Sequence, residues 1–266
     1  MNMRATLNGE PAQIDDLRGL VATNFGHFTS LRVSAGCARG LDLHLQRLNV
    51  STRFLFGEAV DSETVRGWLR DAIAGDESEV SVRINVFSRA FNRERPADCA
   101  KPDVLINVSN APVHSTLPLR VKSFVYERDV PQVKHVGTFA LFHHRRLAQQ
   151  AGVDDALFVD REGNVSEGSI WNIAFFDGTR VVWPNAPQLE GISKQLLKRG
   201  FAQCGVENID TDVPLARIGN FRAAFFTNAS QPVRFIASID EVAFAADDRL
   251  AALLAACYDS NPPQRI

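Results

Sequence analysis

The sequence has few cysteines and no long apolar stretch. Its four cysteines lie far apart and form neither a CxxC pair nor a cluster with histidine: Cys37, Cys99, Cys204 and Cys257. A disulfide framework or a metal site is therefore not expected, and we expect free, mostly buried thiols in a reducing compartment. No uninterrupted apolar run approaches the roughly 18 residues of a membrane span, and the N-terminus has no apolar signal-peptide core. These absences predict a cytoplasmic protein without a membrane partner.

The sequence also lacks an excess of charge of either sign. Lys and Arg together number 29, and Asp and Glu number 31, which gives a formal net charge of −2 over 266 residues. This balance does not attract nucleic acid, and no basic run is interleaved with aromatic residues. A nearly neutral chain can still form a local basic pocket for a small anion. We therefore expect small-molecule substrates and no nucleic-acid partner.

The common catalytic strings are missing as well. The sequence contains no GxGxxG for a dinucleotide, no GxxxxGK[ST] for a nucleotide phosphate, no GxSxG elbow and no HExxH zinc motif. These absences argue against the enzyme classes that such strings mark, so the chemistry has to come from other residues.

The length and the hydrophobic pattern predict an α/β (α+β) fold in two domains. At roughly 150 residues per domain, the chain suits an N-terminal α/β domain at residues 1–110 and a linker at 111–118 with two prolines. The C-terminal domain at 119–266 is expected to carry Lys134, the candidate reactive lysine described below. Helical spacing predicts helices at 41–56, 61–74, 139–151, from 193 onward and at 247–258. Alternation predicts strands at 80–86, 104–108, 119–126, 156–160, 170–176, 223–227 and 233–239. The final NPPQRI is expected to be loose.

Lysine is scarce, and one lysine stands in an unusual place. Only five of the 29 basic residues are lysines, and Lys134 lies between Val133 and Val136, before an apolar helix. Such surroundings disfavour the charged form of an amine and favour a nucleophile near neutral pH. The alternative is a lysine at a strand end that extends its charge into water.

Two further charged residues are candidates for a site. Glu167 lies beside Gly168 between two apolar strands, either as a surface turn residue or as the buried partner of a cation. Arg47 lies on the helix at 41–56, either as a solvated side chain or as a clamp for an anion.

A helix start supplies a candidate phosphate site. Ile192 and Ser193 open a predicted helix, where free N–H groups suit a phosphate, although Ser193 can also act only as an N-cap. With Lys134, Glu167 and Arg47, this start meets the needs of a pyridoxal phosphate site: an amine, an acid for the ring nitrogen and donors for the phosphate.

The order and spacing of these stretches resemble the class IV aminotransferases, the fold-type IV family of pyridoxal phosphate enzymes. The resemblance runs from about residue 7 to residue 240 and is most specific in DDALFVDREGNVSEGSIWNIAFF (154–176), which sets a D-x-x-G turn, Glu167 and Asn172 at fixed offsets. The other matching stretches are FGHFTSLRV (25–33), HLQRL (44–48), VPQVKHVG (130–137), LEGIS (189–193) and FFTNASQPV (225–233).

The resemblance implies a two-domain enzyme with pyridoxal 5'-phosphate between the domains, usually as a homodimer. It implies that Lys134 forms the Schiff base and then acts as general base, that Glu167 keeps the ring nitrogen protonated and that Arg47 clamps the phosphate. It leaves open which residue of 227–230 contacts the phosphate, and whether Trp171 and Asn172 shape the ring environment or only pack. The residues that complete the implied phosphate cradle are Ile192, Ser193, Asn228 and Ala229.

The implied activity is the transfer of an amino group between an amino acid or amine and a 2-oxo acid. A lyase of the aminodeoxychorismate type, which forms 4-aminobenzoate and pyruvate, is the alternative, because the run from Phe28 to Ser30 and the pair Asn228-Ala229 have lyase-like counterparts. A family member without catalysis is a third reading. Phe139 stands where branched-chain enzymes often carry Tyr, which argues against that subgroup, and Lys194 replaces a usual Arg.

Overall fold

Two units of the chain interleave along the sequence in the computed structural model, which describes residues 4–76 and 78–266. The first unit runs up to Val113 and also contains two later segments, Val133–Gly137 and Pro263–Ile266. The second unit consists of His114–Gln132 and Thr138–Pro262. The first break falls inside the linker expected at 111–118, whereas the segment with Lys134 folds with the N-terminal unit and not with its sequence neighbours.

An antiparallel sheet forms the centre of the first unit. Its strand order is β2-β1-β6-β5-β3, and β3 pairs with β5 along its whole length. Alternation places Val82, Ile84 and Val86 of β5 on the face that forms the main core. The strands are β1 (Arg4–Leu7), β2 (Glu10–Pro11), β3 (His27–Val33), β5 (Val80–Phe87) and β6 (Asp103–Asn110).

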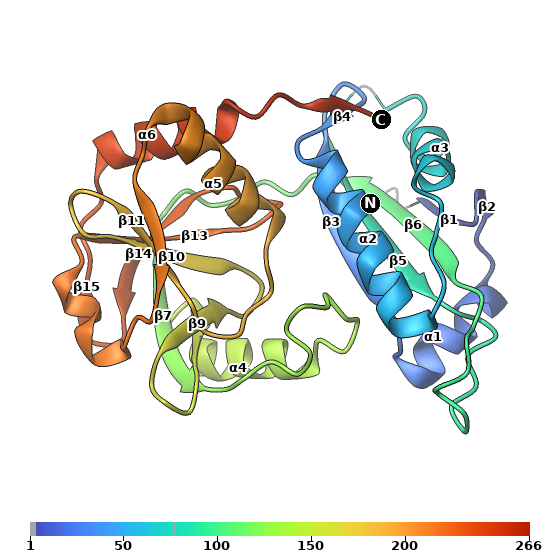
Figure 1. Cartoon of the computed structure of the whole chain (residues 1–266), viewed down its shortest axis with the longest axis horizontal. Helices are drawn as coiled ribbons and strands as arrows, with labels where there is room; N and C mark the ends of the chain where they lie inside the picture. Colours follow the sequence, from blue (N-terminus) through green and yellow to red (C-terminus); the bar gives the residue numbers. More distant parts are fainter. Residues whose placement is uncertain (1–3, 77) are drawn as a thin grey trace. The chain divides into compact units, whose positions relative to one another are not determined.

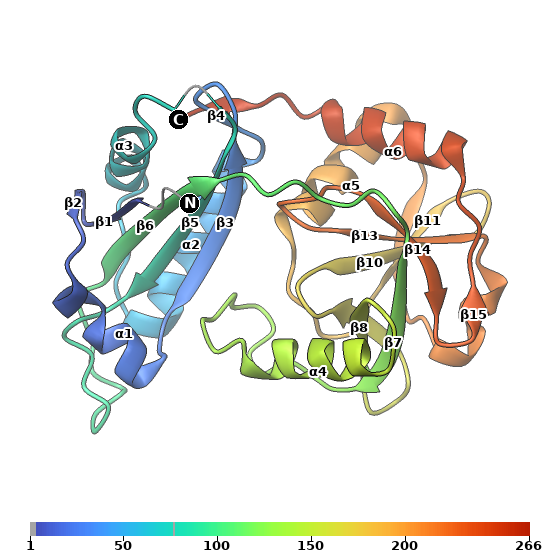
Figure 2. The same cartoon turned by 180° about the vertical axis from the view of Figure 1, so that it is seen from behind.

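Helices α2 (Leu41–Phe56) and α3 (Ser62–Ala72) contribute to that core. Figure 1 shows α2 in front of the strands, and Figure 2 shows the strands in front. The N-terminus of α3 is capped by Asp61, whose carboxylate accepts the Thr64 N–H at 2.8 Å. The other face of the sheet has a small core of its own around Phe87, to which η1 (Ile14–Leu17) and α1 (Arg18–Thr23) add side chains.

The last described residues are part of the main core of the first unit. β16 (Gln264–Arg265) pairs with β4 (Cys37–Ala38), and the Ile266 side chain, 4% exposed, packs in the core. The Ile266 N–H donates to the Gly36 carbonyl at 3.0 Å. The expectation of a loose tail is therefore wrong, because burial of a single isoleucine after two prolines leaves no periodic pattern in the sequence.

The strands of the second unit close into a ring. The path β10-β13-β14-β7-β8-β9 returns to its start because β9 also pairs with β10. Apolar side chains from all six of these strands share one buried cluster, among them Val121, Leu157, Ile173 and Phe226. The strands are β7 (Leu119–Val125), β8 (Asp155–Val159), β9 (Val165–Gly168), β10 (Asn172–Phe176), β11 (Val181–Pro184), β12 (Asn208–Thr211), β13 (Ala223–Thr227), β14 (Arg234–Ile239) and β15 (Val242–Ala243).

Helices pack on the strands of the second unit. α5 (Ile192–Cys204) and α6 (Asp248–Asp259) share a buried cluster with Trp183 and Phe225, and a short turn, η2 (Leu215–Asn220), lies beside β15. Figure 1 shows α5 and α6 on one side of these strands and α4 (Phe139–Gln150) on another. Gly200 lets α5 and α6 touch, since a Cβ there would lie 1.8 Å from the Cys257 carbonyl oxygen.

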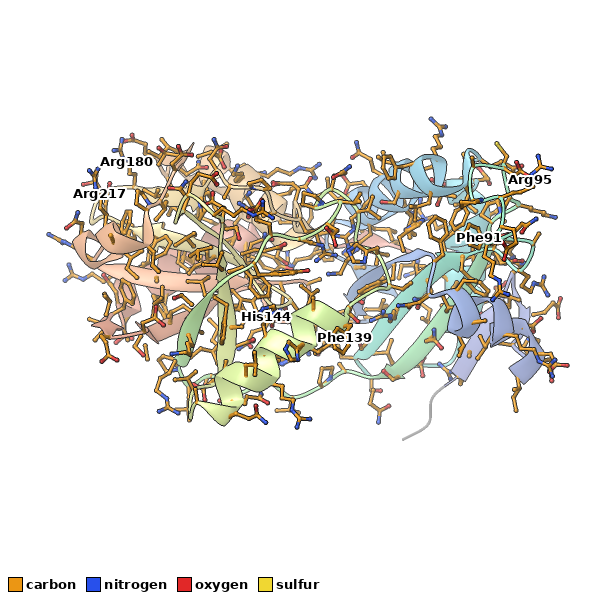
Figure 3. All side chains as sticks on the ribbon, turned by 90° about the horizontal axis from the view of Figure 1, so that it is seen from below. Phe91, Arg95, Phe139, His144, Arg180 and Arg217 are labelled. Carbon is orange, nitrogen blue, oxygen red and sulfur yellow. The ribbon has the colours of Figure 1, made fainter. Side chains whose placement is uncertain are left out.

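Helix α4 buries one face only, although its first turns read as apolar in the sequence. His144 packs against the rings of Tyr126 and Phe158, whereas Phe139, from the first turn of the same helix, is 81% exposed (Figure 3). None of the described helices combines the length and the apolarity that crossing a membrane requires.

Most of the predicted elements are confirmed to within two residues, and the mixed α/β class is confirmed. All four cysteines are free, as expected. The expectation that they are mostly buried is wrong, because only Cys257 is buried and Cys99 and Cys204 are exposed at loop and helix ends.

Candidate active site

Lys134 lies on the edge of the sheet of the first unit. Its carbonyl accepts the Phe28 N–H at 2.9 Å, and the Val136 N–H donates to Gly26 at 2.9 Å, so the segment extends the sheet beyond β3. The Lys134 amine is half-buried, and its Nζ lies 5.0 Å from the centre of the Phe28 ring. The backbone from the Lys134 carbonyl to Val136 is therefore fixed against β3, and the side chain extends from this edge.

Arg47 and Lys134 both lie near His44. The Arg47 guanidinium donates from Nη2 to the Thr29 hydroxyl, and that hydroxyl lies 2.7 Å from Nδ1 of His44. Burial lowers the pKa of His44 well below its ordinary value, and the positive charges of Arg47 and Lys134 lower it further. Both cations therefore lie near one neutral imidazole within the first unit, where they can attract an anion.

A second cation stands over the same phenyl ring. The Arg83 guanidinium carbon lies 3.5 Å from the centre of the Phe28 ring, and Arg83 Nε donates to the Asn85 side chain at 3.2 Å. Among residues 4–76 and 78–266 no carboxylate pairs with Arg83. Arg83 is exposed, although desolvation by its neighbours lowers the pKa of the guanidinium, which stays charged near neutral pH.

In the second unit, Glu167 is buried and is not a surface turn residue. It lies on β9, 4% exposed, directly opposite Asn172 on β10, and Asn172 lies directly opposite Thr227 on β13. Residues that face each other in an antiparallel pair project to the same side of the sheet. Glu167, Asn172 and Thr227 therefore form a row across three strands.

An extra residue in β9 sets the direction of Glu167. Between the pairs Leu157–Gly168 and Val159–Val165, β9 has one residue more than β8, so strict alternation is broken there. Val165 belongs to the apolar cluster of the ring, and the bulge frees Glu167 from following it into that cluster.

The turn after Glu167 is fixed by a buried acid, Asp155. Its carboxylate accepts from Ser169 Oγ at 2.6 Å, from Trp171 Nε1 at 2.9 Å and from Arg145 at 2.7 Å. The turn is tight, because a Cβ on Gly168 would lie 2.0 Å from the Trp171 ring. Asp155 thus holds the loop that joins Glu167 to Asn172, a role that the sequence analysis missed.

The start of α5 lies beside the far end of this row. Gly191 caps the helix without a side chain, and a Cβ there would lie 2.1 Å from the Asn172 amide oxygen. Ser193 Oγ donates to the Asn228 carbonyl at 2.9 Å, which joins the first turn of α5 to the end of β13. The predicted helix start at Ile192 and Ser193 is confirmed as a start, with N–H groups available to an anion.

Asn228 and Ala229, two of the predicted site residues, lie in the turn after β13, and hydrogen bonds within this turn fix its conformation. The Asn228 side-chain oxygen accepts the N–H groups of Ser230 and Gln231 at 2.9 and 2.8 Å, and Ala229 lies at the top of this turn. The Asn228 amide oxygen is thus occupied in shaping the turn, so any contribution of Asn228 and Ala229 to a ligand falls to their other polar groups.

Thr227, at the end of β13, has a buried hydroxyl group without a hydrogen-bond partner among the described residues. Its side chain is 1% exposed. Leaving a buried hydroxyl unpaired costs about 1–3 kcal/mol, so the site fits a ligand that supplies an acceptor. The donors here, the helix start and Thr227, suit a phosphate, and the buried Glu167 suits a protonated ring nitrogen. The residues therefore fit pyridoxal 5'-phosphate.

The predicted residues thus fall into two groups. The first unit contains Lys134 and Arg47, whose charges both act on His44. The second unit brings together Glu167, Ile192, Ser193, Asn228 and Ala229. The sequence analysis left Thr227 open and did not identify His44 and Thr29. The only available signal was that polar residues occupy apolar-spaced positions of β3 and α2.

Comparison with known proteins shows the family. Residues 26–239 match the family described as amino-transferase class IV, so the chain belongs to this family of pyridoxal phosphate enzymes. Over 97 residues it is 33% identical to a probable branched-chain-amino-acid aminotransferase of Rickettsia felis. That stretch is 36% of this chain and 33% of the relative, so the match spans about a third of the length of the curated relative.

Solved structures match over nearly the whole chain. An aminotransferase from Brucella abortus bound to the cofactor PLP has a TM-score of 0.86, with 19% identity over 97% of this chain and 99% of that one. A putative 4-amino-4-deoxychorismate lyase from Legionella pneumophila has a TM-score of 0.82, with 21% identity over 95% and 96%. The expected fold-type IV architecture is therefore confirmed.

Proposed function

We propose that the protein is a pyridoxal phosphate-dependent aminotransferase that moves an amino group between an amino acid or amine and a 2-oxo acid. The observation that carries the proposal is the row of Glu167, Asn172 and Thr227 beside the start of α5. It places a buried acid at one end and a buried, unpartnered hydroxyl at the other, two strands apart, which is about 10 Å at the usual strand spacing. This arrangement suits a ligand with a basic ring nitrogen and a phosphate.

We assign Lys134 as the residue that binds the cofactor covalently and moves the proton. When bound, pyridoxal 5'-phosphate supplies an aldehyde that captures amines and a ring that accepts negative charge from the substrate. Lys134 Nζ would take the proton from the α-carbon of the substrate and return it to the carbon on the other side of the amine nitrogen, which is a 1,3-proton shift. Its fixed backbone and its place beside Phe28 support this role.

Glu167 has an electronic role in the proposal. A carboxylate holds the proton on the ring nitrogen through a charge-assisted hydrogen bond, and a neutral side chain would let that proton leave. Burial of Glu167 strengthens the interaction by excluding water.

Each unit by itself contains groups that suit a phosphate. Arg47 supplies the positive charge, the N–H groups of Ile192 and Ser193 and the turn with Asn228 and Ala229 supply main-chain donors, and Thr227 supplies its hydroxyl. These groups bind the cofactor and take no part in proton transfer, so their loss should affect retention more than rate.

Arg83 supports a substrate that carries a carboxylate. Its guanidinium lies on the same phenyl ring as the Lys134 amine, with no carboxylate of the described residues paired to it. An amino acid or a 2-oxo acid carries a carboxylate next to the α-carbon from which Lys134 would take the proton. We therefore expect amino acids to be better substrates than simple amines.

A lyase of the aminodeoxychorismate type is the second candidate. The lyase-like run from Phe28 to Ser30 supports it, because the Phe28 ring lies near Lys134 and the Thr29 hydroxyl accepts from Arg47. Such an enzyme would use the same Lys134 and Glu167 but release pyruvate in place of exchanging an amino group. The homodimer that the family resemblance implies is also part of the proposal.

The deciding experiment is a half-reaction screen. The protein loaded with pyridoxal 5'-phosphate is mixed with single L- and D-amino acids and with the aminated chorismate, and the visible absorbance and the products are followed. A 2-oxo acid formed without ammonia supports the aminotransferase, whereas 4-aminobenzoate and pyruvate support the lyase. Loss of the cofactor absorbance with neither product would contradict both.

Lys134→Ala is the control for this screen. Borohydride reduction and peptide mapping of the unchanged protein should place the pyridoxyl label on Lys134, and the variant should give no label and no half-reaction. A label on one of the other lysines would overturn the assignment: Lys101, Lys122, Lys194 or Lys198.

A further inference from the structure

Two buried contacts between histidine and threonine join β3 to α2. His44 Nδ1 lies 2.7 Å from Thr29 Oγ1, and His27 Nε2 lies 2.9 Å from Thr52 Oγ1. All four side chains are at most 2% exposed. The two contacts resemble each other in depth and in the elements that they join, and only one of them reaches Arg47.

The direction of the first contact follows from counting protons. A guanidinium only donates, so the Thr29 oxygen accepts from Arg47 Nη2. The hydroxyl has one proton of its own, and among the described residues His44 Nδ1 is the acceptor within reach. His44 is therefore neutral, with its proton on Nε2. A protonated Nδ1 would face the Thr29 oxygen as a second donor and leave the hydroxyl proton without an acceptor.

The second contact runs in the opposite direction. Thr52 donates its hydroxyl proton to the Leu48 carbonyl at 2.7 Å, so its oxygen accepts from His27 Nε2. This contact ends in the main chain of α2, and none of its hydrogen bonds reaches Arg47. It is therefore as buried as the first contact but makes no hydrogen bond to the guanidinium of Arg47.

We propose that His44 is a positioning residue for the cofactor phosphate, acting through Thr29 on the guanidinium of Arg47. This inference rests on the proposed role of Arg47 as the phosphate clamp. As an acceptor, His44 polarises the Thr29 hydroxyl, which makes the oxygen a better acceptor for Arg47 and fixes one side of the guanidinium fork. This contact restricts the orientations of the guanidinium, so less conformational entropy is lost when it binds a phosphate.

The test compares two ligands that differ only in the phosphate. Equilibrium dissociation constants of the apo-protein for pyridoxal 5'-phosphate and for pyridoxal are measured by quenching of the intrinsic fluorescence. Both ligands carry the aldehyde, so their affinity ratio isolates the phosphate contribution. Thr29→Val and His44→Leu should lower this ratio by about tenfold, the equivalent of one hydrogen bond to a charged group. Thr29→Ser, which keeps the hydroxyl, should stay within about twofold of the unchanged protein.

Thr52→Val is the matched control. It removes a buried threonine hydroxyl from the second contact, so it should lower the melting temperature of the apo-protein about as much as Thr29→Val does, with the affinity ratio unchanged. An equal fall of the ratio in Thr52→Val would show a general packing effect and overturn the proposal. The Thr29→Val result stands even if His44→Leu does not fold.

Arg47→Ala separates the inference from the function on which it rests. If Arg47→Ala leaves the ratio unchanged, the phosphate role of Arg47 fails, and the role of His44 fails with it. If Arg47→Ala lowers the ratio and Thr29→Val does not, only the inference about His44 fails. As an independent readout, the nitrogen chemical shifts of the six ¹⁵N-labelled histidines, assigned with His44→Leu, should show His44 protonated at Nε2. A proton at Nδ1 would overturn the proposal.

Discussion

Glu167 and Asn172 face each other where β9 meets β10, and this pair closes the ring of strands in the second unit. Asn172 also faces Thr227, and its amide donates to the Gln188 side chain and to the Leu189 carbonyl at 2.9 and 2.8 Å. The acid and the hydroxyl are therefore held by a closed backbone and not by a mobile loop. A site built on a ring of strands keeps its spacing when a single side chain is changed, so substitutions there report on chemistry.

Glu167→Gln and Arg47→Ala should separate rate from binding. Glu167→Gln keeps the shape and a hydrogen bond but loses the charge that holds the ring proton, so the single-turnover rate should fall by at least about a hundredfold with the cofactor still bound. Arg47→Ala should weaken cofactor affinity by at least about tenfold and affect the rate of the loaded enzyme less. Fluorescence titration and stopped-flow absorbance measure the two quantities. A near-native rate in Glu167→Gln at full occupancy would leave Glu167 without an electronic role.

Thr227→Val should stabilise the apo-protein or leave its stability unchanged, and it should weaken cofactor binding. The Thr227 hydroxyl is buried without a partner among the described residues, so its removal also removes a desolvation cost of about 1–3 kcal/mol. The same change removes a donor from the proposed phosphate site, and affinity for pyridoxal 5'-phosphate should fall about tenfold. Melting temperature without cofactor and cofactor titration test the two halves. A destabilised apo-protein would mean that the hydroxyl has a structural partner.

Asp155→Ala should destabilise the second unit by about 3 kcal/mol, because it leaves the donors Ser169, Trp171 and Arg145 without their acceptor. The neighbouring Asp154→Ala is the control. Its carboxylate is 40% exposed and accepts the Arg120 N–H, so its loss should cost at most about 1 kcal/mol. Urea unfolding of the apo-proteins gives both values. Equal losses would contradict the anchoring role of Asp155.

The first unit should lose stability as the pH falls below about 6.5. Burial and the charge of Arg47 lower the pKa of His27 to about 3, from an ordinary value of 6.5. Between pH 6.5 and about pH 3, His27 binds a proton in the unfolded chain but not in the folded chain. The free energy of unfolding therefore falls by up to about 1.4 kcal/mol for each unit by which the pH falls. His27→Gln should flatten the dependence. Urea unfolding at pH 7, 6 and 5 tests this, and an unchanged slope in the variant would refute it.

The sequence predicts the residues of the Glu167 motif better than it predicts the strand and helix contacts that hold the other site residues in place. The stretch with Glu167 and Asn172 is contiguous, so its offsets carry the information directly. Strand β3 was not predicted, because His27 and Thr29 occupy its buried face and hide the alternation of apolar residues. Their partners lie on α2, and such long-range pairing leaves no local pattern.

The place of Lys134 at the edge of the first sheet could not be predicted from the sequence for a related reason. Its flanking residues predict a strand end before a helix, and nothing local indicates that the segment pairs with Phe28. Ile266 is similar, since a single apolar residue has no period. What the sequence conveys is local, whereas these contacts depend on tertiary structure.

Because the first unit takes in Val133–Gly137 and Pro263–Ile266, its assembly is tied to the order of synthesis. A nascent chain has the helices and most strands of this unit early, but it lacks the segment that extends β3 and the isoleucine that fills the core. Translation of nearly all of the second unit comes in between. The sheet edge that carries the amine we assign to catalysis is therefore completed only by residues that follow the linker in the chain. A nascent chain stopped at the linker would hold Arg47 and His44 but not the lysine, so it could offer the cofactor a charge but no amine.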